Sequence, residues 1–255
     1  MVCNADWQPQ AYDQFAVQRL RPARDLLAQV GALPAGDVVD LGCGSGLAAA
    51  DLKVRFGDRC LIGVDQSASM LQQAGQRGLY DRLDQSDITL WSPHEAPALI
   101  FSNAVLHWLD DHAALLPRLA QMLVPGGVLA VQVPHQSAAP SHRAWIDLAG
   151  VDSPAMPGVL SLQVYAQILQ PLGDVDLWQT EYAQILPPGD QEGHPVRLFT
   201  QTTYARPILT RLSQAKQDAL CAAYDRQMAR AYPLRADGSV LFPFRRLFFV
   251  LRRPT

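Results

Sequence analysis

Short apolar segments alternate with amphipathic helical segments over the first half of the chain, and this alternation restricts the fold more than any other feature. Strands are expected at residues 37–41, 60–64, 98–102 and 128–133, with a weaker one at 83–86. Helices are expected between them at 47–56, 67–76 and 112–123. Strands that alternate with helices form a parallel sheet that is covered on both faces. The fold class is therefore α/β.

The rest of the chain follows a less regular pattern. Apolar residues recur at helical spacing between residues 10 and 30, with Pro22 as a break or kink. Beyond Pro134, helices are expected at 142–148, 162–172, 195–203 and 213–231, and strands at 175–185 and 244–251. There is no internal repeat or low-complexity linker, so we expect a single domain over residues 1–255. Its expected parts are an N-terminal helical lid (1–33), a binding core (34–134), cap insertions (135–243) with a sheet strand near 175–185, and a last strand (244–253).

Composition excludes several classes of protein. The four cysteines lie far apart and form no CxxC pair, so neither a zinc site, another metal site nor a disulfide framework is expected. A formal charge of −3 argues against binding to nucleic acid or to an anionic membrane. No stretch approaches the ~20 apolar residues of a membrane span, and no basic segment followed by an apolar run opens the chain. We therefore expect a cytoplasmic protein, either a monomer or a homodimer.

Charge is distributed unevenly along the chain. Residues 1–195 have a net charge of −11, whereas residues 196–255 have a net charge of +8. Arginine supplies almost all of the cations, and its planar fork binds a carboxylate or phosphate through two bonds at once. Codon bias and an anionic ligand both remain as explanations for this abundance of arginine.

Residues 38–46 read VVDLGCGSG, a strand that runs into a loop with glycine at every second position. Glycines let a ligand approach the backbone N–H groups at the start of the next helix. A dinucleotide fingerprint needs a third glycine where Leu47 stands, which argues against a nicotinamide oxidoreductase. The remaining interpretations are a different nucleoside ligand and a glycine-rich turn that binds nothing.

The segment DLGCGSG resembles the glycine loop of class I S-adenosylmethionine-dependent methyltransferases. The resemblance implies a Rossmann-like, mostly parallel seven-stranded sheet with helices on both faces, an N-terminal helical lid and helical cap insertions in the C-terminal half. It implies S-adenosylmethionine (SAM) as cofactor and S-adenosylhomocysteine as product. The residues that it assigns to the cofactor are Asp40, Gly42, Cys43, Gly44, Gly46, Asp65, Gln66, Asp87, Ile88 and Asn103.

Three of these residues also have ordinary structural interpretations. Asp65 closes the second strand at the spacing where an acid accepts both hydroxyls of a ribose, but an aspartate there can also cap a helix. In the resemblance, Asp87 receives the adenine amino group, Ile88 packs on the ring and Asn103 lies beside the methionine part. Asp87 can instead be a turn residue, and Asn103 can instead satisfy backbone groups of its own turn.

Motifs at both ends of the chain narrow the resemblance. The segments WQPQAY (7–12), YPL (232–234), DG (237–238) and FPFRRLF (242–248) resemble the trans-aconitate 2-methyltransferase family. The chain departs from that family in having His107 where glutamine is expected. The resemblance implies an O-methyltransferase that esterifies a carboxylate of a small polycarboxylic acid such as trans-aconitate.

A polycarboxylate needs cations with directional donors, because its charges lose hydration on binding. Arg246 is the first candidate, since it fits the family's ending, and Arg245 should lie on the opposite face of the same strand. The other candidates for substrate contact are Trp7, Tyr12, Arg21, Trp108, Arg143 and Arg206. Each of these arginines can instead be a solvated surface residue, and the two aromatic residues near the N-terminus can simply pack the first helix on the sheet.

No catalytic residue is required by this chemistry. His107 could serve as a general base, but a carboxylate is already ionised near neutral pH and needs none. Two alternatives to a trans-aconitate-type substrate remain. One is methylation of another free or carrier-bound acid, such as the malonyl group on acyl carrier protein, and the other is nucleoside binding without catalysis.

Overall fold

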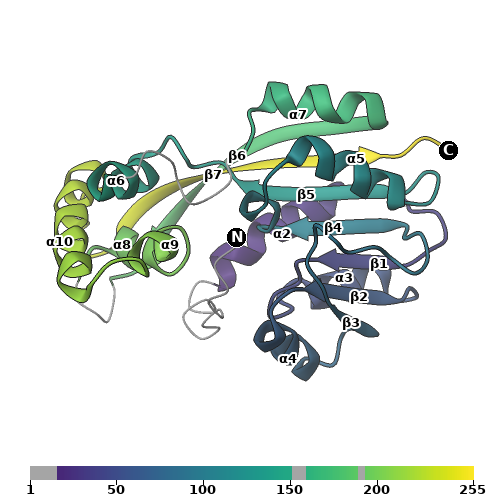
Figure 1. Cartoon of the computed structure of the whole chain (residues 1–255), viewed down its shortest axis with the longest axis horizontal. Helices are drawn as coiled ribbons and strands as arrows, with labels where there is room; N and C mark the ends of the chain where they lie inside the picture. The colour runs from purple at the N-terminus through teal and green to yellow at the C-terminus, as the bar shows by residue number, and fades with distance from the viewer. Residues whose placement is uncertain (1–15, 151–158, 189–192) are drawn as a thin grey trace. The chain divides into compact units, whose positions relative to one another are not determined.

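The computed structural model of the protein describes residues 16–150, 159–188 and 193–255. Within this part of the chain the strands form one seven-stranded sheet in the order β3-β2-β1-β4-β5-β7-β6 (Figure 1). The strands are β1 (Val38–Leu41), β2 (Leu61–Asp65), β3 (Arg82–Gln85), β4 (Leu99–Asn103), β5 (Val128–Pro134), β6 (Asp174–Leu186) and β7 (Val240–Arg252). The expected α/β class, with helices on both faces of a largely parallel sheet, is confirmed.

Strand β1 lies at the centre of the sheet, parallel to β2 on one side and to β4 on the other. Its residue Val39 is in register with Ile62 of β2 and Ile100 of β4. Every residue of β1 is buried, as expected for a parallel strand covered on both faces. The carboxyl ends of β1, β2 and β4 therefore meet at the same edge of the sheet.

The chain divides into two compact units, which we describe separately. Among the described residues, the larger unit contains residues 16–133, 160–179 and 247–255, and the smaller unit contains residues 134–150, 159, 180–188 and 193–246. Strands β6 and β7 contribute residues to both units.

The larger unit carries five of the helices in the described part of the chain. They are α2 (Ala16–Gln29), α3 (Ala49–Phe56), α4 (Ala68–Gln76), α5 (His112–Met122) and α7 (Leu162–Leu169), with short 3₁₀ turns η1 (Leu106–Trp108) and η2 (Gln170–Leu172). Helix α2 continues through Pro22, so of the break or kink expected there, the break does not occur. The proline removes one backbone hydrogen bond, but Leu26 and Val30 beyond it are fully buried and keep the segment packed.

The smaller unit is built on helices packed through aromatic side chains. Its helices are α6 (Pro140–Ala149), α8 (Pro195–Gln201), α9 (Arg206–Leu209) and α10 (Gln214–Ala231). The ring of Trp145 stacks on Tyr224 at 3.9 Å between centroids, and its Nε1 donates to Thr200 Oγ1 at 2.9 Å. These contacts join α6, α8 and α10. The four-residue helix α9 was not foreseen, because a single turn has no recognisable apolar period.

Strand β7 begins four residues earlier than expected, at Val240. The expected strand began directly after Pro243, and a proline lacks the N–H that a strand normally donates. Here the Pro243 carbonyl accepts a hydrogen bond from Gln136 Nε2 at 2.8 Å, so a side chain supports the strand at this point. None of the helices in the described segments is long and apolar enough to span a membrane.

Candidate functional site

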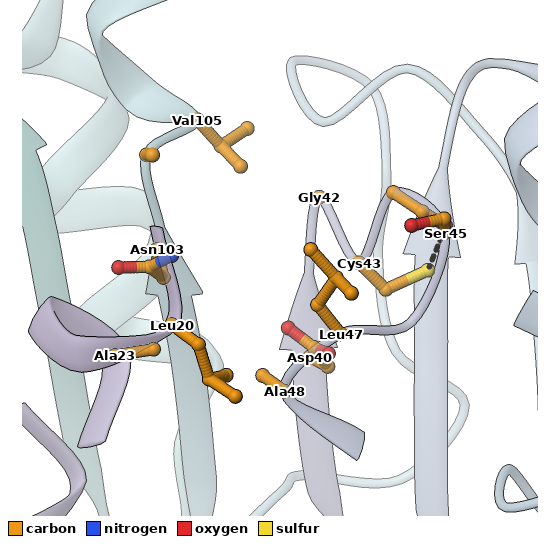
Figure 2. Close-up of a pocket in the computed structure, with 12 residues that line it drawn as sticks. Leu20, Ala23, Asp40, Gly42, Cys43, Ser45, Leu47, Ala48, Asn103 and Val105 are labelled. Atoms are coloured by element: carbon orange, nitrogen blue, oxygen red, sulfur yellow. Dashed lines mark hydrogen bonds between the residues drawn. The ribbon is translucent and has the colours of Figure 1, made fainter. Parts of the chain in front are cut away.

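A pocket opens in the larger unit where β1 and β4 end (Figure 2). It is lined by Leu20 and Ala23 of α2, by Asp40, by residues 42–45 with Leu47 and Ala48, and by residues 103–105. Figure 2 shows Asn103 and Val105 on the opposite side of this pocket from the glycine loop. The structure thus brings six of the ten expected cofactor residues close together: Asp40, Gly42, Cys43, Gly44, Asn103 and, directly beside them, Gly46.

Two glycines of the loop are required by geometry. Gly42 has φ +78°, and a Cβ there would lie 2.4 Å from both methyl carbons of Val105. Gly44 has φ +53°, and a Cβ there would meet nothing within 4 Å. The backbone at Gly44 is therefore exposed to open space beside the pocket, where a ligand can approach it closely.

Asp65 lies at the end of β2 and ties the glycine loop to the next helix. Its Oδ2 accepts the Gly44 N–H at 2.9 Å, and its Oδ1 accepts the Ser67 N–H at 2.9 Å. The cap of α4 is Ser67, whose Oγ accepts the Met70 N–H, so Asp65 itself is not the N-cap. An ionised carboxylate has about four acceptor positions, so acceptor capacity remains for a ligand. Burial raises the pKa of Asp65, while hydrogen bonds from the backbone of Ser67, Gly44 and Gln66 oppose that shift.

Asp40 is a buried carboxyl on the pocket wall. It is 3% exposed, and burial raises its pKa to about 7, with the nearby charge of Asp65 adding to the shift. The Tyr80 hydroxyl donates to Asp40 Oδ2 at 2.6 Å and opposes the shift. Because its environment penalises the charge, Asp40 is a group that a cationic ligand would stabilise in the ionised form.

Asn103 presents an unsatisfied polar atom. Its Oδ1 is buried and has no hydrogen-bond partner among the described residues. The next residue, Ala104, adopts φ +58° with its N–H bonded to the Gln132 carbonyl at 2.9 Å, so the turn's backbone is satisfied without the Asn103 side chain. A buried acceptor without a donor costs ~1–3 kcal/mol, which makes Asn103 a candidate ligand contact.

Asp87 and Ile88 lie in a turn that does not line the pocket. Asp87 is exposed, and its Oδ1 accepts from both the N–H and the hydroxyl of Thr89 at 2.8 and 2.7 Å, as in a capped turn. Ile88 is buried. Arg118 of α5 holds this turn by donating to the carbonyls of Ile88 and Trp91 at 2.5 and 2.7 Å. The role of Arg118 in this turn was not recognised from the sequence.

His107 and Trp108 belong to η1, and neither lines the pocket. His107 is buried against Trp108, with ring centroids 4.8 Å apart. His112 fixes this segment, since its Nε2 bonds to the Leu106 carbonyl at 2.8 Å and its Nδ1 to the Tyr165 hydroxyl at 2.7 Å. Gln66, the remaining expected cofactor residue, accepts a bond from Gln85 Nε2 through its carbonyl.

The arginines expected to contact a substrate differ sharply in burial. Arg21 is exposed on α2, and Arg143 is exposed on α6, where it pairs with Asp147 at 3.0 Å. Arg206 is half-buried at the start of α9. Arg246 is only 3% exposed. Trp7 and Tyr12 lie outside the described residues.

Comparison with known proteins decides the family. Residues 12–206 match the model of a methyltransferase domain. The chain is 38% identical to a trans-aconitate 2-methyltransferase of Paracidovorax citrulli strain AAC00-1, and the alignment covers 97% of this chain and 98% of that protein. A protein of the same name from Azoarcus sp. strain BH72 is 41% identical over 97% of this chain and 99% of its own length. The chain belongs to the trans-aconitate 2-methyltransferase family.

Solved structures agree with this family on the fold. The YcgJ protein of Bacillus subtilis superposes with a TM-score of 0.58 at 15% identity, covering 92% of this chain and 99% of that one. Phosphoethanolamine N-methyltransferase 2 of Haemonchus contortus, solved in complex with S-adenosyl-L-methionine, gives a TM-score of 0.57 at 17% identity, covering 96% of this chain and 56% of that one. At these identities the likeness shows a shared methyltransferase fold.

Two residues were missed: Tyr80, which bonds to Asp40 on the pocket wall, and Arg118, which holds the 88–91 turn. Tyr80 and Arg118 carry no motif, and their partners lie 40, 27 and 30 positions away along the chain. The only sequence signal for Tyr80 is its place before the third strand, where an aromatic residue can pack beneath the glycine loop. A Cβ at Gly46 would meet its ring at 3.0 Å.

Proposed function

We propose that this protein transfers a methyl group from S-adenosylmethionine to a carboxylate of trans-aconitate, a small tricarboxylic acid, and forms a methyl ester. The observation that carries the proposal is near full-length similarity to trans-aconitate 2-methyltransferases at 38–41% identity. The pocket between the glycine loop and Asn103 supports it, because the open groups there complement the polar parts of the cofactor.

The donor set fits S-adenosylmethionine. The cofactor carries an ammonium and a sulfonium, and the pocket offers the Asp40 carboxyl and the unsatisfied Asn103 Oδ1. Gly44, with open space beside its Cα, admits the backbone of a methionyl group. Asp65 retains acceptor capacity for the two ribose hydroxyls, as its strand-end position predicts.

Once bound, S-adenosylmethionine supplies an electrophilic methyl group carried on a positively charged sulfur. The protein's own task is to place a carboxylate oxygen in line with that methyl group and to remove water from it. Orientation of this kind is worth ~7–11 kcal/mol in favourable systems. No general base is needed, since the attacking carboxylate is ionised near neutral pH. His107 accordingly has no required proton-transfer role.

Substrate carboxylates other than the attacking one need cationic partners. Arg246 is our choice, since it is the most buried of the candidate arginines and a desolvated guanidinium binds a carboxylate through two bonds. Binding must be directed at the non-reacting carboxylates, because a strong bond to the attacking oxygen would stabilise the ground state and slow transfer.

A carrier-bound substrate finds less support. Docking of an acidic carrier protein would favour a strongly cationic face, yet α10 carries three cations (Lys216, Arg226 and Arg230) and two acids (Asp218 and Asp225). The free acid is therefore the favoured substrate.

The function is tested by incubating the protein with radiolabelled S-adenosylmethionine and a panel of di- and tricarboxylic acids, with ester products identified by mass spectrometry. We expect trans-aconitate to be methylated with the highest kcat/KM. Failure to methylate any free acid, with cofactor binding intact by calorimetry, would overturn the proposal.

Cofactor binding should depend on pH through Asp40. Its pKa of about 7 in the free protein means that the carboxyl is largely protonated at pH 6. The cationic cofactor favours the ionised form, so we expect affinity to rise about five- to tenfold between pH 6 and 7.5. The Asp40→Asn variant should lose this slope. Calorimetric titrations across this pH range check the prediction, and an unchanged slope in the variant would refute it.

Arg118 should act on the cofactor through the 88–91 turn. Replacing it by alanine removes both bonds to the turn's carbonyls. We expect the KM for S-adenosylmethionine to rise about tenfold, while the KM for trans-aconitate stays within twofold. Arg118→Lys restores one donor and should recover part of the loss. Initial-rate kinetics with each substrate varied in turn separate the two KM values, and equal changes in both would contradict the turn-positioning role.

A further inference from the structure

Tyr80, in the segment between α4 and β3, lies directly against the glycine loop of the larger unit. Its hydroxyl donates to Asp40 Oδ2 at 2.6 Å. A Cβ at Gly46 would lie 3.0 Å from Cε2 of the Tyr80 ring, and a Cβ at Gly63 would lie 2.9 Å from its Cε1. The ring is therefore packed between the loop and strand β2, and its hydroxyl bonds to a carboxyl that lines the pocket.

Gly63 makes room for this ring in the middle of β2. Its φ lies outside the left-handed region, so the backbone conformation itself does not require glycine. A glycine inside a strand weakens the strand and often marks the close approach of another group. A Cβ at this position would lie 2.7 Å from Leu83 Cδ2, 2.9 Å from the Tyr80 ring and 3.0 Å from Cys43 Sγ. The close packing of Tyr80 against the sheet therefore depends on a glycine at position 63.

The segment that carries Tyr80 is anchored on both sides of this residue. The Asp81 N–H donates to the Leu61 carbonyl at 2.9 Å, and Asp81 Oδ2 accepts the Leu61 N–H at 2.7 Å. On the other side, Arg77 Nε donates to the Ser45 carbonyl of the glycine loop at 2.5 Å. The tyrosine hydroxyl is therefore held in place before a ligand binds, and a donor placed in advance needs little ordering during binding.

The groups around the Asp40 carboxyl act on its charge in opposite directions. Burial raises the pKa of Asp40 to about 7, and the negative charge of Asp65 at the end of β2 adds to this shift. Within the described part of the chain, the hydrogen bond that opposes the shift comes from Tyr80 alone. A hydrogen bond donated to the ionised form of a carboxyl favours that form. The fraction of Asp40 that is ionised near neutral pH therefore depends on the Tyr80 hydroxyl.

Neither Tyr80 nor Cys43 adds a negative charge beside Asp40. Burial raises the pKa of Tyr80, and the charge of Asp40 raises it further, so the hydroxyl keeps its proton at neutral pH. Burial likewise raises the pKa of the Cys43 thiol. Of the described residues that line the pocket, only Asp40 and Cys43 are titratable. A change in the charge of the pocket wall near neutral pH is therefore a change in Asp40.

We propose that Tyr80 is a positioning residue for cofactor binding, whose hydroxyl holds the Asp40 carboxyl ionised and in a fixed orientation toward the ammonium of S-adenosylmethionine. This inference rests on the cofactor role proposed above for Asp40 and adds Tyr80, which acts through that carboxyl. Without the tyrosine hydroxyl, Asp40 binds a proton more tightly near neutral pH, and the cationic cofactor has to displace this proton on binding. Tyr80 thus sets the pH range in which the pocket binds its cofactor tightly.

The test is Tyr80→Phe, which keeps the ring between the loop and β2 and removes only the hydroxyl. The probe is S-adenosylhomocysteine, which retains the ammonium, and calorimetric titrations from pH 6 to pH 9 give its affinity. We expect the pH midpoint of binding to rise by about one pH unit or more, with affinity at pH 7.5 reduced about threefold or more and regained toward pH 9.

Tyr224→Phe is the matched control, because it also removes a buried tyrosine hydroxyl. That hydroxyl donates to the Ser141 carbonyl at 2.7 Å in the smaller unit. We expect this variant to have a lower melting temperature and an unchanged pH midpoint of S-adenosylhomocysteine binding. A general loss of stability is thereby separated from an effect on Asp40.

A double-mutant cycle checks that Tyr80 acts through Asp40. In the Asp40→Asn background, Tyr80→Phe should change the affinity for S-adenosylhomocysteine by less than about twofold. An equal loss in both backgrounds would show that Tyr80 only packs beneath the loop and would overturn the inference. Carbon-13 NMR of the free protein adds a readout without cofactor. The Asp40 carboxyl signal, assigned with Asp40→Asn, should titrate at higher pH in Tyr80→Phe, and an unchanged titration would also overturn the inference.

These measurements do not depend on the methyl acceptor, so they separate failure of this inference from failure of the proposed function. If wild type methylates trans-aconitate while Tyr80→Phe keeps the wild-type pH midpoint, the inference is overturned and the function stands. If wild type methylates no free acid while the midpoint rises in Tyr80→Phe, the function is overturned and the inference stands. If Asp40→Asn binds S-adenosylhomocysteine with the same pH dependence as wild type, Asp40 does not hold the ammonium and the inference is overturned.

Discussion

Replacing Arg246 by alanine should lower kcat/KM for trans-aconitate by about a hundredfold or more, with the affinity for S-adenosylmethionine unchanged. A buried guanidinium that binds a carboxylate through two charged bonds contributes several kcal/mol, and its removal also leaves the substrate's charge desolvated. The loss should appear mainly in KM, because the carboxylate that we propose Arg246 binds is not the one that reacts. Steady-state kinetics with trans-aconitate varied at saturating cofactor measure the effect.

The chain supplies a close control for this prediction. Arg245 is the next residue of β7, faces the other way and pairs with Glu181 on the surface, so Arg245→Ala should change kcat/KM less than twofold. Arg246→Lys keeps the charge but loses the second bond, and we expect an intermediate effect. A lowered melting temperature in Arg246→Ala with unchanged kinetics would show that Arg246 serves packing against Phe244 rather than substrate binding.

The charge split along the sequence has a largely structural explanation. Arg252 donates to the Gly126 carbonyl at 2.9 Å, and Arg253 donates to the carbonyls of Gln121 and Leu123, so both hold the end of β7 to the segment before β5. Arg197 pairs with Asp225. Several cations in the last quarter of the chain therefore satisfy the protein's own acceptors. The excess of arginine in this part of the sequence is therefore weaker evidence for an anionic substrate than the sequence alone suggested.

The features that could be predicted from the sequence depend on spacing over a few residues, whereas the contacts that were missed join residues far apart in the chain. The loop DLGCGSG, the alternating strands and the opposite faces of Arg245 and Arg246 follow from spacing over a few residues, and the structure agrees with each of them. Tyr80 and Arg118 could not be found in this way. Tyr80 bonds to Asp40, 40 positions earlier, and Arg118 bonds to the carbonyls of Ile88 and Trp91, 30 and 27 positions earlier, and no periodic pattern connects residues at such separations.

The same reason explains the errors at prolines. Pro22 was interpreted as a break or kink because of what proline does to the local backbone, and the last strand was expected to begin directly after Pro243. In each case tertiary contacts outweighed the local effect of the proline on the backbone. Burial of the apolar face keeps α2 continuous, and the Gln136 side chain supports β7 where the missing N–H would weaken it.

Asp65→Ala should weaken S-adenosylmethionine binding by about a hundredfold or more. The variant loses the acceptors proposed for the two ribose hydroxyls, and each hydrogen bond to a charged group is worth ~1.5–3 kcal/mol. It also loses the bond to the Gly44 N–H that holds the glycine loop. Burial penalises the Asp65 charge, so removing it should cost less in folding stability than in binding. Calorimetric titration with the cofactor and thermal unfolding without it measure the two effects separately.

Ser67→Ala is the control variant for Asp65→Ala. Ser67 caps α4 and lies two residues from Asp65, so its replacement should cost ~1 kcal/mol of stability while cofactor affinity stays within threefold. If Asp65→Ala instead behaves like Ser67→Ala, with lower stability and nearly unchanged affinity, Asp65 serves only to join the glycine loop to α4. A large selective loss of affinity is expected only if the cofactor uses the acceptor capacity that the backbone leaves open on this carboxylate.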